Sequence, residues 1–188
     1  MVFGNENSSI PEGLLTETFL IRPLSATDVE LDYAAVMESK SFLRKWDQST
    51  WPEDEFTLAD NLEDLERHER EYINRQSFTF TVMNTAETDC LARWLSQAQT
   101  TPIGQTKWTE YEAIILFWIR QSQLATGLDR LLLDLLRPWF AQEWTFDGHL
   151  FFTNEQFEQQ TAMFEASDLQ LQFKVILPKQ PRRYHAYI

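Results

Sequence analysis

The segment from Ile119 to Arg130 connects an apolar run to an amphipathic run, with Gly127 between them. Free amides at a helix N-terminus, together with the helix dipole, hold anions such as a diphosphate, and small residues let the backbone come close. Asp129 adds a carboxylate to this turn. A second interpretation stays open, in which Asp129 is a favourable acid in a first helical turn and Gly127 is ordinary turn punctuation.

Metal and thiol chemistry are not expected from this sequence. His68, His149 and His185 are far apart and lack carboxylate or cysteine partners at metal-ligand spacing, so we expect no metal site. Cys90 is the single cysteine, and a small buried thiol is its expected role.

Length and composition indicate one globular domain. The chain has 188 residues, of which 43% are hydrophobic. A formal net charge of -13 opposes nucleic-acid binding. No stretch approaches the roughly 20 apolar residues of a membrane span, and the first residues lack a signal pattern, so we expect no membrane partner and a cytoplasmic location. The acidic surface suits a cationic partner, although solubility explains it as well.

The first half of the chain predicts a loose arm over residues 1–13, followed by one domain over residues 14–188. A strand is expected over Thr18–Arg22, ended by Pro23. One helix is expected from Asp28, with its apolar face continuing to Trp46. The spacing of apolar residues predicts a second, acidic-faced helix over Leu58–Ile73. Two alternating runs, Phe78–Val82 and Leu91–Leu95, predict a hairpin.

The second half begins with a polar loop over Gln97–Thr109. Ala113–Ile119 is apolar on both faces, which is typical of a strand inside a covered sheet. A helix follows over Leu128–Trp144, which Pro138 is expected to kink or divide. The pattern ends with a strand over His149–Thr153, a helix over Glu155–Ala166 and a long strand from Leu169 to Leu177. This order predicts an α/β fold with a mixed sheet and helices on both faces.

The run from Leu15 to Leu24 reads Leu-Thr-Glu-Thr-Phe-Leu-Ile-Arg-Pro-Leu and is followed by Asp28. It resembles the opening strand of the GNAT branch that includes the ribosomal-protein N-terminal acetyltransferases, and the later elements agree in order from Leu15 to the C-terminus. The resemblance implies a GNAT-like acyl-CoA N-acyltransferase fold. It also implies transfer of an acetyl group from acetyl-CoA to a primary amine, on a peptide N-terminus or a small cationic molecule.

In that family an Arg or Gln, two residues, a Gly, one residue and a Gly or Ala open the central helix. Here Gly127 keeps one small position, while Leu124 and Asp129 replace the Arg or Gln and the second small residue. The resemblance implies a cofactor site made of Trp118, Ile119, Arg120, Thr126, Gly127, Leu128, Asp129, Arg130 and Asn154. Solvent exposure of the two arginines, and a helix-capping role for Asn154, are the alternatives.

Acetyl transfer needs an uncharged amine, and therefore a base. Glu112 is the expected base, with Glu110 nearby, and capping of the strand in solvent is the alternative role for either residue. A backbone amide near Trp118 or Ile119 is the expected oxyanion donor. Phe164 stands where the family often has a tyrosine acid and is expected in the core. The second hypothesis is therefore a catalytically degenerate GNAT-like binding or scaffold domain. A homodimer is a further expectation.

Overall fold

The computed structural model describes residues 9–98, 111–146, 148–176 and 182–188. In this part of the chain eight strands form one sheet, in the order β1-β2-β3-β4-β5-β6-β8-β7. All neighbours are antiparallel except β5 and β6, which run parallel. The strands are β1 (Leu14–Leu15), β2 (Phe19–Pro23), β3 (Ser77–Asn84), β4 (Cys90–Ala98), β5 (Ala113–Ile119), β6 (His149–Asn154), β7 (Leu171–Ile176) and β8 (Arg183–Tyr187).

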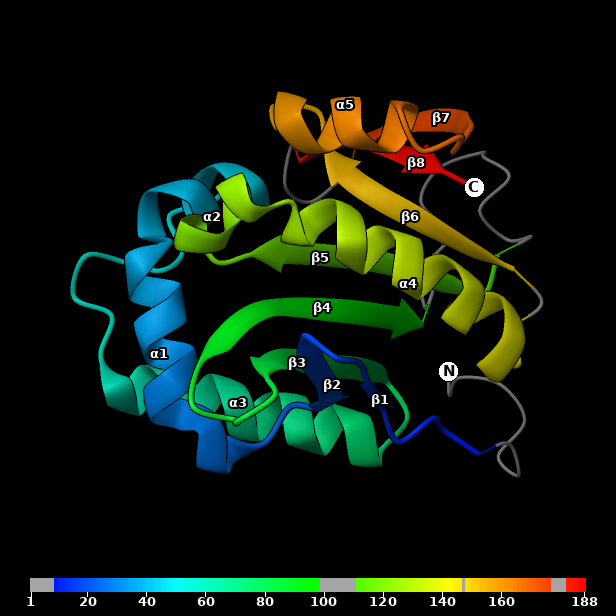
Figure 1. The fold of residues 1–188 in the computed structure, drawn as a ribbon. Helices are drawn as coiled ribbons and strands as arrows, with labels where there is room; N and C mark the ends of the chain where they lie inside the picture. The colour runs from blue at the N-terminus through cyan, green and yellow to red at the C-terminus, as the bar shows by residue number, and fades with distance from the viewer. Residues whose placement is uncertain (1–8, 99–110, 147, 177–181) are drawn as a thin grey trace.

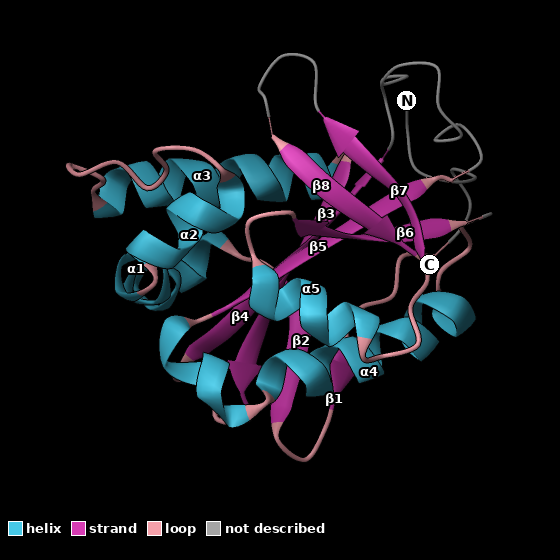
Figure 2. Ribbon diagram, turned by 90° about the horizontal axis from the view of Figure 1, so that it is seen from above, coloured by secondary structure: helices cyan, strands magenta, loops and turns pink. Residues whose placement is uncertain are grey.

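Helices cover both faces of this sheet. The helices are α1 (Val29–Glu38), α2 (Lys40–Asp47), α3 (Leu58–Ile73), α4 (Leu128–Glu143) and α5 (Glu158–Glu165), with 3-10 turns over Ala26–Asp28 and Gln121–Thr126. Figures 1 and 2 show α1, α2 and α3 on one side of the sheet and α4 and α5 on the other. The mixed α/β sheet with helices on both faces is therefore confirmed. None of the described helices has the length and apolar character needed to span a membrane.

Two cores follow from the alternation of side chains along β5. Phe117 and Ile119 point toward α4 and α5 and pack in a core that includes Leu132, Phe140 and Phe164. The residue between them, Trp118, points to the opposite face and packs with residues of α1 and α2. One strand therefore separates two apolar compartments, and its end lies beside both.

Local signals place the helices on the α1–α3 face. Helix α3 begins at a capping box, because Thr57 Oγ1 accepts the Asp60 amide at 3.2 Å and Asp60 Oδ2 accepts the Thr57 amide at 2.8 Å. The helix expected from Asp28 through Trp46 is in fact two helices that meet at Ser39. Ser39 Oγ accepts the Gln121 amide at 3.0 Å. This hydrogen bond fastens the break in the helix to the end of β5.

Two further expectations were wrong in detail. Helix α4 runs without a break through Pro138 from Leu128 to Glu143, so the proline does not divide it. The long strand expected from Leu169 to Leu177 is the edge strand β7, and the last strand, β8, enters between β6 and β7. The expected loop over Gln97–Thr109 and the arm over residues 1–13 lie largely outside the described residues, although Ile10 packs against the core.

Candidate active site between β5 and β6

The parallel strands β5 and β6 pair at one end and diverge at the other. Their register covers three pairs among the described residues, which are Ala113 with His149, Ile114 with Leu150, and Ile115 with Phe151. β5 continues to Ile119 and β6 to Asn154 beyond this short ladder. The sheet therefore has an opening between Phe117 and Thr153, where backbone groups have to find other partners.

Side chains from both faces bind to the backbone in this opening. Phe117 O accepts hydrogen bonds from Trp46 Nε1 at 3.1 Å and from Gln160 Nε2 at 3.0 Å. Thr153 Oγ1 in turn donates to Gln160 Oε1 at 2.8 Å. The buried carboxamide of Gln160 thus bridges β5 and β6 where the backbone ladder has ended. The carbonyl of Phe117 is fully used within the chain.

The N-terminus of α4 lies next to this opening, and side chains of the protein itself form hydrogen bonds there. Gly127 has φ +79°, and a Cβ at this position would meet nothing within 4 Å. Thr126 Oγ1 accepts the Leu128 amide at 3.3 Å, and Asp129 Oδ1 accepts the Arg130 amide at 2.8 Å. Gln159 Nε2 donates to Asp129 Oδ2 at 3.4 Å. The first helical turn therefore carries an internal carboxylate at an anion-binding position.

The two arginines expected near a phosphate are both engaged in ion pairs. Arg120 contacts Glu38 at 2.6 Å and also binds Asp89. Arg130 binds Asp134 at 2.9 Å. The backbone of this corner suits a diphosphate, with a left-handed glycine and open space beside it. Its side chains do not complement the charge of a diphosphate, because a carboxylate occupies the helix terminus and the nearby cations are paired.

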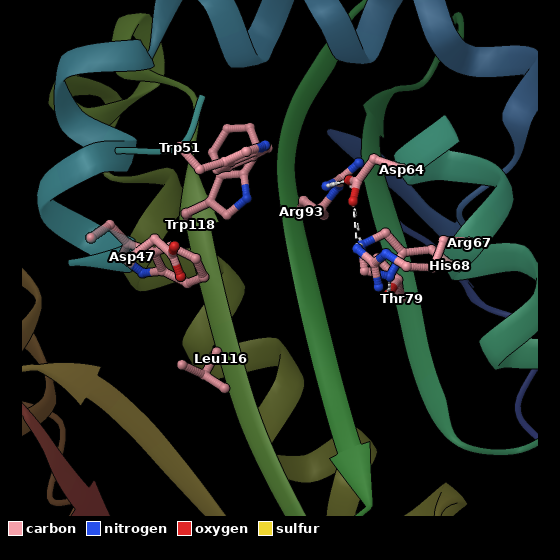
Figure 3. A pocket seen from close by; sticks show the side chains of 10 residues that line it. Asp47, Trp51, Asp64, Arg67, His68, Thr79, Arg93, Leu116 and Trp118 are labelled. Carbon is pink, nitrogen blue, oxygen red and sulfur yellow. Dashed lines mark hydrogen bonds and ion pairs between the residues drawn. The ribbon is translucent and has the colours of Figure 1, made fainter. Parts of the chain in front are cut away.

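A cavity of about 270 Å³ lies on the opposite face of the same strands, under α2 and α3. Figure 3 shows Asp47, Trp51, Trp118 and Leu116 on one side of it and Asp64, Arg67, His68 and Thr79 on the other, with Arg93 between them. Trp46 completes the lining. Arg93 in β4 and Trp118 in β5 are register partners, so they share this face of the sheet. The cavity therefore reaches from the α3 side to the diverging end of β5.

The α3 side of the cavity is a buried charge network. Arg93 donates to Asp32 at 3.0 Å and to Asp64 at 3.3 Å. Burial acts to raise the pKa of Asp64, but His68, Arg93 and Arg67 together outweigh it and hold that pKa well below its usual range. His68 Nε2 lies 3.0 Å from Arg67 Nη2 and 3.5 Å from Asp64 Oδ2, and His68 Nδ1 lies 2.9 Å from Thr79 Oγ1.

The β5 side of the cavity is mainly aromatic and holds one carboxylate. Asp47 is the last residue of α2 and accepts hydrogen bonds from Ser49 Oγ and from Arg182 Nη2, the latter at 2.9 Å. Burial raises the pKa of Asp47, although Ser49 and Arg182 act against that rise. A negative charge at a helix C-terminus is also disfavoured by the helix dipole.

No protein-family model matches this sequence, and no curated protein matches it. Solved structures do match in fold. RimL, a ribosomal L7/L12 alpha-N-protein acetyltransferase in complex with coenzyme A, has a TM-score of 0.70 at 13% identity over 93% of this chain and 94% of that chain. The microcin C7 self-immunity acetyltransferase MccE, in complex with acetyl-CoA and AMP, has a TM-score of 0.71 at 11% identity, over 95% and 96% of the two chains. The ribosomal-protein-S5-alanine acetyltransferase from Vibrio fischeri has a TM-score of 0.66 at 12% identity, over 93% and 94%.

This chain has the GNAT acetyltransferase fold. The resemblance of Leu15–Leu24 to the opening strand of that family is thereby confirmed at the level of the fold. Within the GNAT fold the expected site residues fall into distinct groups. Gly127, Leu128 and Asp129 lie at the α4 N-terminus, while Trp118 lines the cavity on the other face.

Asn154 and Glu112 lie elsewhere. The buried carboxamide of Asn154 donates to the carbonyls of Lys45 and Trp46, so it anchors α2 to β6. Glu112 precedes β5 at its paired end, six residues from Trp118, which corresponds to about 20 Å of extended strand. Its role as a base stays a prediction. Phe164 is fully buried in the core, where it packs against Phe117 and Tyr187.

Sequence reasoning missed Asp47, Asp64, His68 and Arg93 as members of one cavity. They come from α2, α3 and β4, and neither their spacing nor their types form a motif. One signal was present. Arg93 is a lone charge inside the otherwise apolar run from Cys90 to Leu95, and a charged residue inside such a strand needs a buried partner.

Proposed function

We propose that this protein is an N-acetyltransferase that moves an acetyl group from acetyl-CoA to a primary amine. One observation carries the proposal, namely the diverging end of β5 and β6 with a cavity against Trp118 on the face away from α4. In a GNAT fold this arrangement gives the acetyl donor and the acceptor amine separate approaches to one strand end. Structures of this fold with coenzyme A and with acetyl-CoA support the choice of donor.

The acceptor is proposed to enter through the cavity, as a peptide or protein N-terminus or as a small amine. Acetyltransferases of ribosomal proteins among the structures of the same fold support the first class. The aromatic and acidic lining of the cavity suits an amine attached to an apolar group. The protein's own contribution is to hold that amine beside β5, to take up one proton and to exclude water, because only the uncharged nitrogen can form the new C–N bond.

A second candidate function has specific support. Asp129 already accepts a hydrogen bond from the Arg130 amide in the first turn of α4. The Phe117 carbonyl already accepts hydrogen bonds from Gln160 and Trp46. Phe164 has no hydroxyl to act as an acid. These features favour a binding or scaffold domain that has kept the fold and lost the donor. In the transferase interpretation, the Asp129 carboxylate has to leave the Arg130 amide before a diphosphate can use it.

Two measurements separate these functions. Acetyl-CoA is titrated while the melting temperature is followed, since a ligand that prefers the folded state raises it. Release of free coenzyme A is then followed with a panel of peptides and small amines. The transferase predicts a saturable rise in melting temperature and thiol release that depends on the amine. If millimolar acetyl-CoA does not change the melting temperature, the scaffold function replaces the transferase function.

A further inference from the structure

Asp47 lies in the most apolar part of the cavity. Its carboxylate shares the lining with Leu116 and with three indole side chains, those of Trp46, Trp51 and Trp118. Figure 3 shows Asp47 on the β5 side, between Trp118 and Leu116, away from the charge network on α3. Indole faces attract cations, and a carboxylate beside them adds a counter-charge. This combination is typical of a site for an ammonium group.

The surrounding structure fixes this carboxylate next to the diverging end of β5. Trp46, the preceding residue, donates from its indole to Phe117 O at 3.1 Å. Asn154 in β6 holds the carbonyls of Lys45 and Trp46 from the other side of the opening. The end of α2 is thereby bound to both β5 and β6. A ligand at Asp47 lies beside the strand end at which the acetyl donor is proposed to arrive.

One oxygen of Asp47 is left for a ligand. Both hydrogen bonds that the described residues make to this side chain, from Ser49 and from Arg182, end on Oδ2. About a fifth of the side chain, 22%, remains exposed. Oδ1 therefore has no hydrogen-bond partner in the described part of the chain, and Asp47 is a lining residue of the cavity.

The charge balance around the cavity favours a single positive charge. The described groups that line it or pair directly with a lining residue are four carboxylates and three guanidiniums. They are Asp32, Asp47, Asp64 and Glu71, and Arg67, Arg93 and Arg182. His68 is the remaining titratable group of the lining. By formal charge the carboxylates outnumber the guanidiniums by one, so a ligand with a single positive charge suits this set better than an anion or a polyamine.

We propose that the acceptor of this protein is a monovalent amine with an adjacent aromatic or large apolar group, held at Asp47 Oδ1 among the three indoles, and that Asp47 takes its proton. The ammonium site stands by itself, whereas the role of the bound amine as acceptor and the proton step rest on the proposed transferase function. The N–H bond of the ammonium breaks and the Oδ1–H bond forms. The freed lone pair then attacks the thioester carbon as the C–S bond breaks, and the second amine proton leaves with the thiol.

The apolar lining makes this proton transfer feasible. Burial penalises both members of an ammonium–carboxylate pair, so it raises the pKa of the acid and lowers that of the amine until the neutral pair competes. Burial already raises the pKa of Asp47 in the free protein. Glu112, at the far end of β5, is not among the residues that line the cavity.

The binding step is tested without acetyl-CoA, by calorimetric titration of the full chain with phenethylamine. The neutral 2-phenylethanol and the anionic phenylacetate serve as matched ligands. Asp47→Asn keeps the shape of the side chain, and we expect it to weaken phenethylamine binding about tenfold or more, because a hydrogen bond between charged groups is lost. Binding of 2-phenylethanol should not change. Glu66→Gln, at an exposed carboxylate of α3 outside the cavity lining, should leave both affinities unaltered.

Arg182→Gln is the matched control for folding, because it removes the same ion pair and keeps the carboxylate. We expect this variant to bind phenethylamine more tightly. Equal loss of binding in Asp47→Asn and Arg182→Gln would mean that the ion pair only shapes the cavity, and would overturn the proposal. Wild-type protein that fails to bind phenethylamine, or that binds phenylacetate better, would also overturn it.

The proton step has its own readout. In a protein that transfers acetyl groups, Asp47→Asn should lower kcat by about 100-fold or more, as expected for loss of a general base. Full kcat in this variant would overturn the catalytic role. If ammonium binding depends on Asp47 but no amine is acetylated, the transferase function and the proton step both fail, and the ammonium site is supported by itself.

Discussion

Arg93 in β4 and Asp32 in α1 form an ion pair of 3.0 Å with 7% and 1% of their side chains exposed. The pair crosses from the sheet to the helix layer, and its Arg93 member lines the cavity. Arg93 also reaches Asp64 in α3, so a single guanidinium links α1, α3 and β4. The placement of the α1–α3 layer therefore depends on one buried cation.

Arg93→Met is expected to lower the free energy of unfolding by about 3–5 kcal/mol, because it leaves the buried Asp32 carboxyl without its ion-pair partner. Urea unfolding followed by circular dichroism measures this change. Arg130→Met is the control. Its ion pair with Asp134 is exposed, and its loss should cost less than about 1 kcal/mol. Similar losses in the two variants would contradict the assignment of the Arg93 pair as buried.

Much of the fold is predictable from the sequence because the signals are local. The double-sided apolar run Ala113–Ile119 is β5 to the residue, and the periodic segment Leu58–Ile73 is α3. The break at Ser39 and the place of β8 are not local, since they depend on a hydrogen bond to Gln121 and on pairing with β6. The cavity is less predictable still, because its side chains meet only after α2 and α3 pack on β4 and β5.

Acid should weaken the α3 side of the cavity. The pKa of Asp64 is lower in the folded chain than its unfolded value of about 3.9. Its carboxylate therefore adds stability above pH 4, and that contribution is lost as the pH falls toward the folded pKa. Unfolding free energies measured at pH 7, 5, 4 and 3 should fall below pH 4, and Asp64→Asn should flatten this fall.

The control for this acid effect is Asp54→Asn. The pKa of Asp54 is also lowered, by Arg44 and Lys40, but its carboxylate is on the surface. Solvent screens such a pair, so the pH dependence of stability should hardly change in this variant. A profile for Asp64→Asn that matches the wild type would show that Asp64 is not the group responsible.

The thiol of Cys90 should be unreactive in the native protein. Burial, aided by the Asp32 carboxylate, raises the pKa of this thiol to about 12, so the reactive thiolate is scarce at neutral pH. A disulfide reagent that releases a coloured thiolate should label no thiol in native protein and one thiol per chain in guanidinium chloride. Fast labelling of one thiol per chain without denaturant would contradict this prediction.

Gly127→Ala tests the backbone at the α4 N-terminus. A left-handed residue with a Cβ costs about 1–2 kcal/mol, and here the space around the added atom is open, so backbone strain is the only expected cost. Gly127→Asn should cost less, because asparagine tolerates this conformation better. Thermal unfolding of both variants measures the difference. A larger loss for asparagine than for alanine would point to crowding instead.

Asp129→Ala should strengthen the binding of acetyl-CoA. Removing the carboxylate frees the Arg130 amide and removes a negative charge from a helix N-terminus, an effect of about two- to fivefold in Kd. Calorimetric titration measures it, with Glu143→Ala at the other end of α4 as the charge-matched control. Weaker binding in Asp129→Ala than in the control would show that the carboxylate itself contacts the donor.

The short ladder between β5 and β6 also makes a weak joint in the sheet. The strands β6, β8 and β7 are joined to β5 by three backbone register pairs and the Gln160 bridge, whereas β3 and β4 are joined by seven pairs. Deuterium should therefore enter the amides of β8 through a partial opening, at a lower free energy than the global unfolding that exposes β3. Gln160→Ala should widen that gap, and the C-terminal unit would behave as a separate foldon.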